Sequence, residues 1–111
     1  MMNVFLLVGK VKEVPVVSTT AKGNNIAHMI VEADRNFRNE DGSLSSDLFK
    51  VTLWKGIADE CAAICGEGSL VAIRGRLKSD VYTRNDREYY NTEIIAEQVK
   101  FLDGRRNRTE G

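Results

Sequence analysis

The stretch from Ser69 to Tyr82, SLVAIRGRLKSDVY, alternates between two kinds of side chain. Because successive side chains of a β-strand point to opposite faces, this alternation predicts a long strand with one mostly apolar face. Gly75 interrupts the run, and a bulge or a sharp bend fits a glycine at that place. The other face carries three cations and one aromatic ring: Arg74, Arg76, Lys78 and Tyr82.

Apolar and alternating patterns predict four further strands, and Gly9 interrupts the first of them as Gly75 interrupts the fourth strand of the chain. These strands are expected at residues 4–12, 26–37, 48–55 and 89–102. Polar stretches rich in Gly, Asn and Asp separate them, which predicts turns and one hairpin loop. The turns are expected at residues 18–25 and 83–88, and the loop at residues 38–47.

A short helix is predicted between the third and fourth strands, at residues 56–65. Ile57, Cys61 and Ile64 recur there at helical spacing, and Gly66 follows as a stop. Long strands with internal glycines and one helix in this order predict an all-β, five-stranded OB-fold barrel. A two-layer sheet with one helix is the alternative, and the glycines within strands favour the barrel. The domain is expected to span residues 1–103, with residues 104–111 as a short, disordered basic tail.

The composition excludes several functions. The chain of 111 residues has 16 Lys and Arg against 16 Asp and Glu, so any basic surface must be local. No apolar stretch is long enough for a membrane span, and the start does not predict a signal peptide. Two cysteines are too few for a disulfide scaffold, which favours the reducing cytoplasm. Cys61 and Cys65 are too few for a closed zinc site and predict packed core thiols. His28 has no nucleophile at a recognisable spacing. We therefore expect no catalytic residues, no metal and no cofactor.

Cations and aromatic rings share the outward faces of three predicted strands, which is the combination that unpaired nucleic acid requires. For each residue alone, an oligomer interface, a core gap or a hydrated surface is the simpler interpretation. For the set we favour nucleic acid, because solubility poorly explains an exposed tryptophan on a cationic strand. The predicted DNA-binding residues are Arg35, Phe37, Arg38, Lys50, Trp54, Arg74, Arg76, Lys78 and Tyr82.

Four stretches in the same order and spacing make the chain similar to the bacterial single-stranded DNA-binding proteins over residues 3–102. They read NVFLLVGKV, IAHMIVEADRNFR, LFKVTLWKGIADECAAICGEGSLVAIRGRL and EYYNTEIIAEQVKFL. The resemblance implies an OB-fold, a homotetramer and binding of single-stranded DNA without sequence specificity in replication, recombination or repair. It places base-stacking positions at Phe37, Leu48, Trp54 and Tyr82. Leu48 stands where a ring is usual, and Asp80 and Val81 stand where cations are common.

The C-terminus departs from that family. Members devoted to replication carry a long tail with an acidic tip that binds partner enzymes, whereas this chain ends DGRRNRTEG. We therefore expect a short form that does not recruit replication enzymes through its tail. A short paralogue, a primosome-type accessory protein and a chain cut before its tail all fit this ending.

A different function stays open beside DNA binding, namely a protein-interaction module on an OB scaffold, such as a replication-restart (primosome) accessory with weak DNA binding. The zero net charge and the scarce cations near Tyr82 favour it. The first strand, VFLLV, is apolar on both faces, which predicts a symmetric oligomer built from pairs of first strands.

Overall fold

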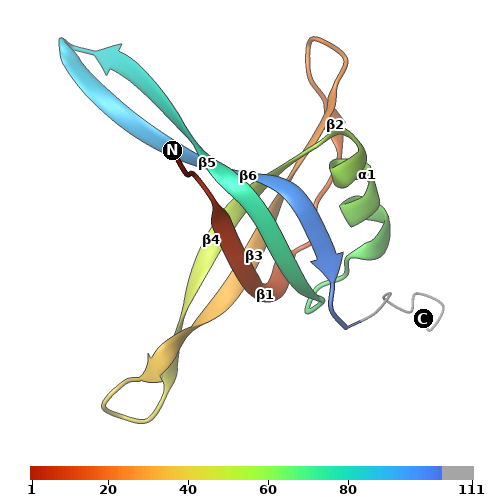
Figure 1. Ribbon diagram of the computed structural model, residues 1–111, viewed down its shortest axis with the longest axis vertical. Helices are drawn as coiled ribbons and strands as arrows, with labels where there is room; N and C mark the ends of the chain where they lie inside the picture. The colour runs from red at the N-terminus through yellow and green to blue at the C-terminus, as the bar shows by residue number, and fades with distance from the viewer. Residues whose placement is uncertain (104–111) are drawn as a thin grey trace.

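Six strands and one helix make up the computed structural model, which describes residues 1–103 (Figure 1). The strands are β1 (Phe5–Glu13), β2 (Ser18–Thr19), β3 (Asn25–Arg38), β4 (Leu44–Trp54), β5 (Leu70–Arg84) and β6 (Arg87–Phe101), and helix α1 (Lys55–Ile64) follows β4. Within the described residues, no helix has the length and apolar character that crossing a membrane requires.

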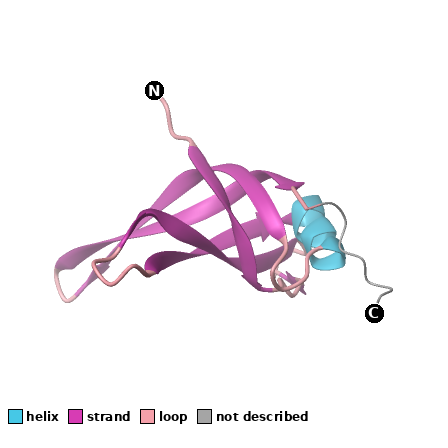
Figure 2. Ribbon diagram, turned by 90° about the horizontal axis from the view of Figure 1, so that it is seen from below, coloured by secondary structure: helices cyan, strands magenta, loops and turns pink. Residues whose placement is uncertain are grey.

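The strands form a closed barrel. Their order is β1-β5-β6-β4-β3-β2, and β1 also pairs with β3, which joins the two sides of the sheet. Strands β4 and β6 run parallel to each other, and the other pairs are antiparallel. Helix α1 lies at one end of the barrel (Figure 2). This confirms the predicted OB-fold barrel and excludes the two-layer sheet.

The period-2 alternation decides which side chains fill the barrel. Val51 and Leu53 of β4 are fully buried, and their register partners on β3, Met29 and Ala27, are buried too. Lys50, which precedes Val51, belongs to the outer face and is exposed. The predicted division of the third strand into an inner and an outer face is therefore confirmed.

Helix α1 packs its apolar face against the core through Ala58, Cys61 and Ile64. The helix begins and ends one residue earlier than predicted. Both thiols are free and buried, so the prediction of packed core cysteines is confirmed. A hydrogen bond with Cys65 and burial raise the pKa of the Cys61 thiol, which keeps it protonated.

The two glycines within strands mark the places where backbones come closest. A Cβ atom on Gly9 would collide with the carbonyl oxygen of Glu32 on β3, and one on Gly75 with the carbonyl oxygen of Ile95 on β6. At Gly75 the register of β5 against β6 also shifts by one residue, which leaves Glu97 as the extra residue of a β-bulge. The predicted bulge at Gly75 is thus present.

The two long hairpins exceed their predicted lengths. Strand β4 begins at Leu44, inside the stretch that predicted a loop, because its residues pair with β3 as far as Arg38. Strands β5 and β6 continue to a turn of two residues, Asn85 and Asp86, whose φ angles of 53° and 62° suit the short polar side chains there. The predicted turn at residues 18–25 also contains the short strand β2. The sequence predicted loops at these paired residues because their side chains are exposed and polar, as loop residues usually are.

The close approach of the β5 and β6 backbones at Gly75 leads to a first prediction. Gly75→Ala should lower the free energy of unfolding by about 1–3 kcal/mol, since the added methyl group forces the β5 and β6 backbones apart. Urea denaturation measures this change. Gly56→Ala is the matched control, because no atom lies within 4 Å of its added Cβ. Equal stability of the Gly75 variant and the parent protein would show that the close backbone approach is not required.

Candidate nucleic-acid interface

Two β-hairpin arms leave the barrel and carry most of the exposed aromatic rings (Figure 1). The β5–β6 arm comprises residues 78–93, which pair only with each other among the described strands. The β3–β4 arm comprises residues 34–47, where β3 and β4 likewise pair only with each other. Both arms are available to contact a ligand along their sides because neither is covered by another strand.

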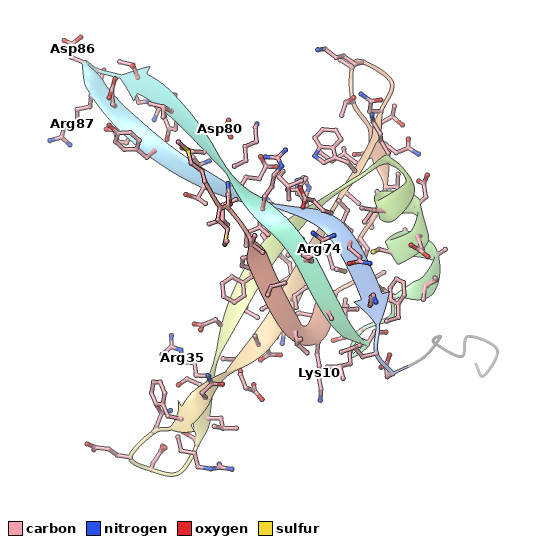
Figure 3. All side chains as sticks on the ribbon, in the orientation of Figure 1. Lys10, Arg35, Arg74, Asp80, Asp86 and Arg87 are labelled. Carbon is pink, nitrogen blue, oxygen red and sulfur yellow. The ribbon has the colours of Figure 1, made fainter. Side chains whose placement is uncertain are left out.

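The β5–β6 arm presents a pair of stacked rings. Tyr82 is 50% exposed and stacks on Tyr89 with the ring centroids 5.4 Å apart and an interplanar angle of 20°. Tyr89 was not among the predicted site residues. The two-residue turn places it opposite Tyr82, so the register of the hairpin was the signal that could have found it. Two cations, Arg84 and Arg87, face each other at the tip, next to Asp86 (Figure 3).

A chain of polar contacts joins the base of this arm to β4. The hydroxyl of Thr52 donates a hydrogen bond of 2.8 Å to Glu93, and Lys78 lies 4.0 Å from Glu93 and 3.2 Å from Asp80. Thr52 is buried although it belongs to the outer face of β4. The structure thereby brings Lys78 of β5 close to the outer face of β4.

A polar hollow of about 300 Å³ opens at this junction. Strand β3 contributes one residue, β4 two and β6 three: His28, Lys50, Thr52, Asn91, Thr92 and Glu93. Lys50 makes no ion pair with any residue in the range 1–103. This cation is therefore available to an external anion without breaking an internal contact.

Trp54 lies on the same outer face of β4 as Lys50, two positions beyond Thr52 and opposite Ile26 of β3. Its side chain is half-buried, and the helix begins at the next residue. Leu48 is 58% exposed on this face and lies opposite Glu32. The outer face of β4 thus carries, in order along the strand, the exposed Leu48, the cation of Lys50 and the indole of Trp54.

Arg74 lies elsewhere, where β1 pairs with β5 (Figure 3), and Arg76 follows on β5 just past Gly75, the last residue of β5 that pairs with β1. Arg74 is the register partner of Leu6, and both arginines face the bulged Glu97, at 4.0 Å from Arg74 and 3.6 Å from Arg76. The alternation of β5 placed them correctly on its outer face with Lys78. It could not show that β1 pairs with β5 only as far as Gly75, so that Arg74 lies beside β1 and Lys78 does not.

The same side of the barrel is apolar along β1. Leu6 and Val8 of β1 point outward and are 71% and 58% exposed, and Val4, just before the strand, is 55% exposed. A hollow beside them is lined by residues from β1, β5 and β6, including Ala72 and Arg74. Apolar side chains in a row at such exposures are typical of a surface that another protein surface covers.

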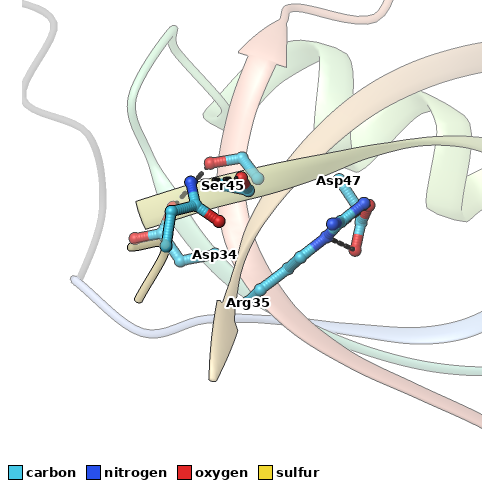
Figure 4. Close-up of polar contacts among 6 residues, drawn as sticks. Asp34, Arg35, Ser45 and Asp47 are labelled. Atoms are coloured by element: carbon cyan, nitrogen blue, oxygen red, sulfur yellow. Dashed lines mark hydrogen bonds and ion pairs between the residues drawn. The ribbon is translucent and has the colours of Figure 1, made fainter. Parts of the chain in front are cut away.

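The β3–β4 arm holds the remaining predicted residues. Arg35 donates hydrogen bonds to the Asp47 carboxylate, the shortest of 2.8 Å, across the hairpin (Figure 4). These bonds lower the pKa of Asp47 and raise that of Arg35. Phe37 is 65% exposed near the tip, where Arg38 donates to the Gly42 carbonyl.

Taken together, the barrel and its outer face define an OB-fold binding protein, with rings and cations on two hairpin arms and on the outer face of β4, and with a polar hollow between β3, β4 and β6. Four of the six predicted cations, however, already contact a carboxylate: Arg35, Arg74, Arg76 and Lys78.

The comparisons with known proteins agree with this class. The chain belongs to the single-strand binding protein family, whose model matches residues 2–102. Single-stranded DNA-binding protein B of Bacillus subtilis is 34% identical over 93% of this chain and 92% of its own length. Single-stranded DNA-binding protein 2 of Listeria monocytogenes is 31% identical over 100% of this chain and 70% of its own length. The family is one of binding proteins, in agreement with the prediction that the chain is not an enzyme.

A solved structure shares the fold. A Plasmodium falciparum SSB in complex with ssDNA superposes with a TM-score of 0.74 at 23% identity, covering 93% of this chain and 96% of that one. At this level of identity the likeness supports the barrel architecture. The predicted tail, residues 104–111, lies outside the described residues.

The ion pair on the β3–β4 arm gives a second prediction. In Arg35→Gln, the pKa of the Asp47 carboxyl should rise toward its ordinary value, because the charged hydrogen bonds that favour the carboxylate are lost. Asp41 is the internal control, since its pKa is lowered by Ser43 and should stay low. A carbon-detected NMR titration of the side-chain carboxyl groups measures both.

The Arg35–Asp47 pair also makes the stability of the β3–β4 arm depend on pH. Because the pKa of Asp47 is lower in the folded state, the stabilisation is complete above the ordinary Asp pKa and is lost as the pH falls through the folded-state value. Acid should therefore loosen this arm more in the parent protein than in Arg35→Gln. An unchanged Asp47 titration in the variant would contradict the pairing.

Proposed function

We propose that this chain binds single-stranded DNA without sequence specificity and so protects or organises it in replication, recombination or repair. Membership of the single-strand binding protein family supports this function, as do the names of its relatives. The observation that carries the proposal is the outer surface on which Trp54 and the stacked Tyr82 and Tyr89 flank Lys50 and Lys78. Rings of this kind stack on bases while the cations between them contact phosphates.

The proposed path of the strand crosses the outer face of β4 and continues along the β5–β6 arm. Trp54 stacks one base, Lys50 and Lys78 contact phosphates, and the Tyr82–Tyr89 pair stacks another base. Phe37 and Arg38 on the second arm extend the surface. The proposed contacts are thus the predicted set, Arg35, Phe37, Arg38, Lys50, Trp54, Arg74, Arg76, Lys78 and Tyr82, with Tyr89 added.

Within this set, Arg74 and Arg76 should contribute least. Both face Glu97, and Arg74 is the register partner of Leu6 on the apolar outer face of β1. If that face is covered by a second copy of the chain, the two arginines stand at the margin of the interface rather than on the path of the strand.

The assembly that we propose is a homotetramer, as in the family that the chain resembles, with Val4, Leu6 and Val8 covered by other copies. Their exposure in the single chain supports this interface. We place the protein in the cytoplasm, because two free, buried thiols suit a reducing compartment.

A protein-interaction module remains the second candidate, and one observation favours it. Leu77, Val81 and Tyr90 on the opposite side of the β5–β6 hairpin are 41%, 54% and 72% exposed. An apolar partner surface could cover them without touching the stacked rings. On this alternative, binding of DNA is weak and the arm serves a protein partner.

Paired variants test DNA binding. Trp54→Ala should weaken binding to oligo-thymidine strongly, because stacking contributes about 1–3 kcal/mol per base, and should leave the salt dependence nearly unchanged. Lys78→Ala should weaken binding less and should lower the slope of log K against log salt by up to about 0.7. Titrations at several salt concentrations measure both. Arg76→Ala is the control for Lys78→Ala on the same strand face, and its slope should change less.

The fluorescence of the parent protein reports on the same surface, because Trp54 is its sole tryptophan. Two results together would favour the interaction module instead: Trp54 fluorescence that does not change at saturating oligo-thymidine, and equal affinities for duplex and single-stranded DNA.

The proposed assembly can be tested separately. Leu6→Lys should convert the oligomer to a smaller species at micromolar concentration, since it places a charge in the apolar outer face of β1. Light scattering measures the mass. Val81→Lys is the matched control: it is similarly exposed but lies on the β5–β6 arm. A parent protein that is monomeric at this concentration would refute the tetramer.

A further inference from the structure

We propose that Glu93 selects for unpaired bases: the hollow beside it receives a nucleobase, and its carboxylate accepts base N–H groups while it repels the phosphate backbone. This inference rests on the proposed function and names the residue that sets its specificity. The starting observation is that Glu93, a carboxylate, lines the surface that we propose to bind DNA, although DNA is itself an anion.

The position of Glu93 is fixed from two sides. The Thr52 hydroxyl, which is buried, donates to Oε2 of Glu93 at 2.8 Å, and Nζ of Lys78 lies 4.0 Å from Oε1. The Glu93 side chain keeps 29% of its surface exposed. An anchored carboxylate with an exposed remainder can accept further hydrogen bonds from a ligand.

The hollow that Glu93 lines has the size and the chemistry for one base. Its volume of about 300 Å³ lies at the lower end of small-molecule sites, which are roughly 300–1,000 Å³. Asn91 supplies both donors and acceptors, Lys50 supplies a cation, and Glu93 supplies acceptors alone. These groups match the mixed donors and acceptors on the edge of a base.

A phosphate group does not match this centre. Phosphate oxygens carry negative charge and have no proton to donate, so they are repelled by an ionised carboxylate. Lys78, which lies 4.0 Å from Glu93, and Lys50, which lines the hollow with it, offer the phosphates of the same strand an alternative place. A single strand can therefore turn a base toward Glu93 and its backbone toward the lysines.

Duplex DNA cannot adopt this arrangement. Its base N–H groups are largely engaged in base pairs, and its phosphates face outward. A duplex therefore brings negative phosphates close to Glu93 but offers few free base N–H groups that could donate hydrogen bonds to it. Glu93 should therefore disfavour duplexes and other polyanions more than it disfavours single strands. Such selection differs from a general reduction of affinity, which would affect both ligands alike.

The test compares Glu93→Gln with the parent chain on oligo-deoxycytidine and on a DNA duplex, by fluorescence anisotropy at one salt concentration. Glutamine keeps the size and an acceptor for Thr52 but removes the charge. Duplex affinity should rise about five-fold, the order expected for one unit charge about 4 Å away in water. Affinity for oligo-deoxycytidine should rise distinctly less, so that the preference for single strands falls.

Two further glutamates provide matched controls. Glu97→Gln removes a carboxylate from the same strand, outside the hollow and against Arg74 and Arg76, and should change both affinities by the same factor. Glu60→Gln, on helix α1, should change neither. Circular dichroism and thermal midpoints establish that each variant is folded.

The inference is overturned if Glu93→Gln raises the affinities for duplex DNA and for oligo-deoxycytidine by the same factor, or if it changes neither affinity. It is also overturned if Glu97→Gln changes the ratio of the two affinities as much as Glu93→Gln does. A parent chain that binds the duplex but not oligo-deoxycytidine would overturn the proposed function itself, and this inference with it. The two failures are distinguishable because the second is seen without any variant.

Discussion

Close contact between backbones at two glycines is the constraint on which the rest of this molecule depends. Gly9 meets β3 and Gly75 meets β6 at distances that admit no side chain. The first contact lets β1 bridge β3 and β5, and so closes the barrel. The second coincides with the β-bulge, beyond which β5 and β6 continue together as an arm. The same two strands therefore supply the core at one end and the proposed binding surface at the other.

Charge on this surface is balanced locally. The zero net charge of the chain reflects cations that face carboxylates across neighbouring strands, as Arg35 faces Asp47 and Lys78 faces Glu93. Exposed pairs of this kind contribute little to stability, typically below about 1 kcal/mol. They do influence a polyanionic ligand, because each carboxylate offsets the attraction of its partner for phosphate. On such a surface, recognition rests more on aromatic rings than on charge.

Much of the fold could be predicted because alternation and helical spacing are local properties of the sequence. The inner and outer residues of β4, the helix and the glycine at the bulge all follow from neighbours in the chain. Contacts between strands depend instead on register and on which strands are adjacent. The separation of Arg74 from Lys78 and the position of Glu93 were therefore out of reach, and the stack of Tyr82 on Tyr89 could be found only through the register of the hairpin. The arms were predicted too short because their exposed polar side chains resemble those of loops.

The central claim is that unpaired bases stack on the outer face of β4 and on the β5–β6 arm. Ultraviolet cross-linking of oligo-thymidine to the protein, followed by mass spectrometry of the linked peptides, tests it most directly. The account predicts cross-links at Trp54 and at Tyr82 or Tyr89, and none on the outer face of β1. Cross-links confined to β1, or an absence of cross-links at saturating oligo-thymidine, would contradict it.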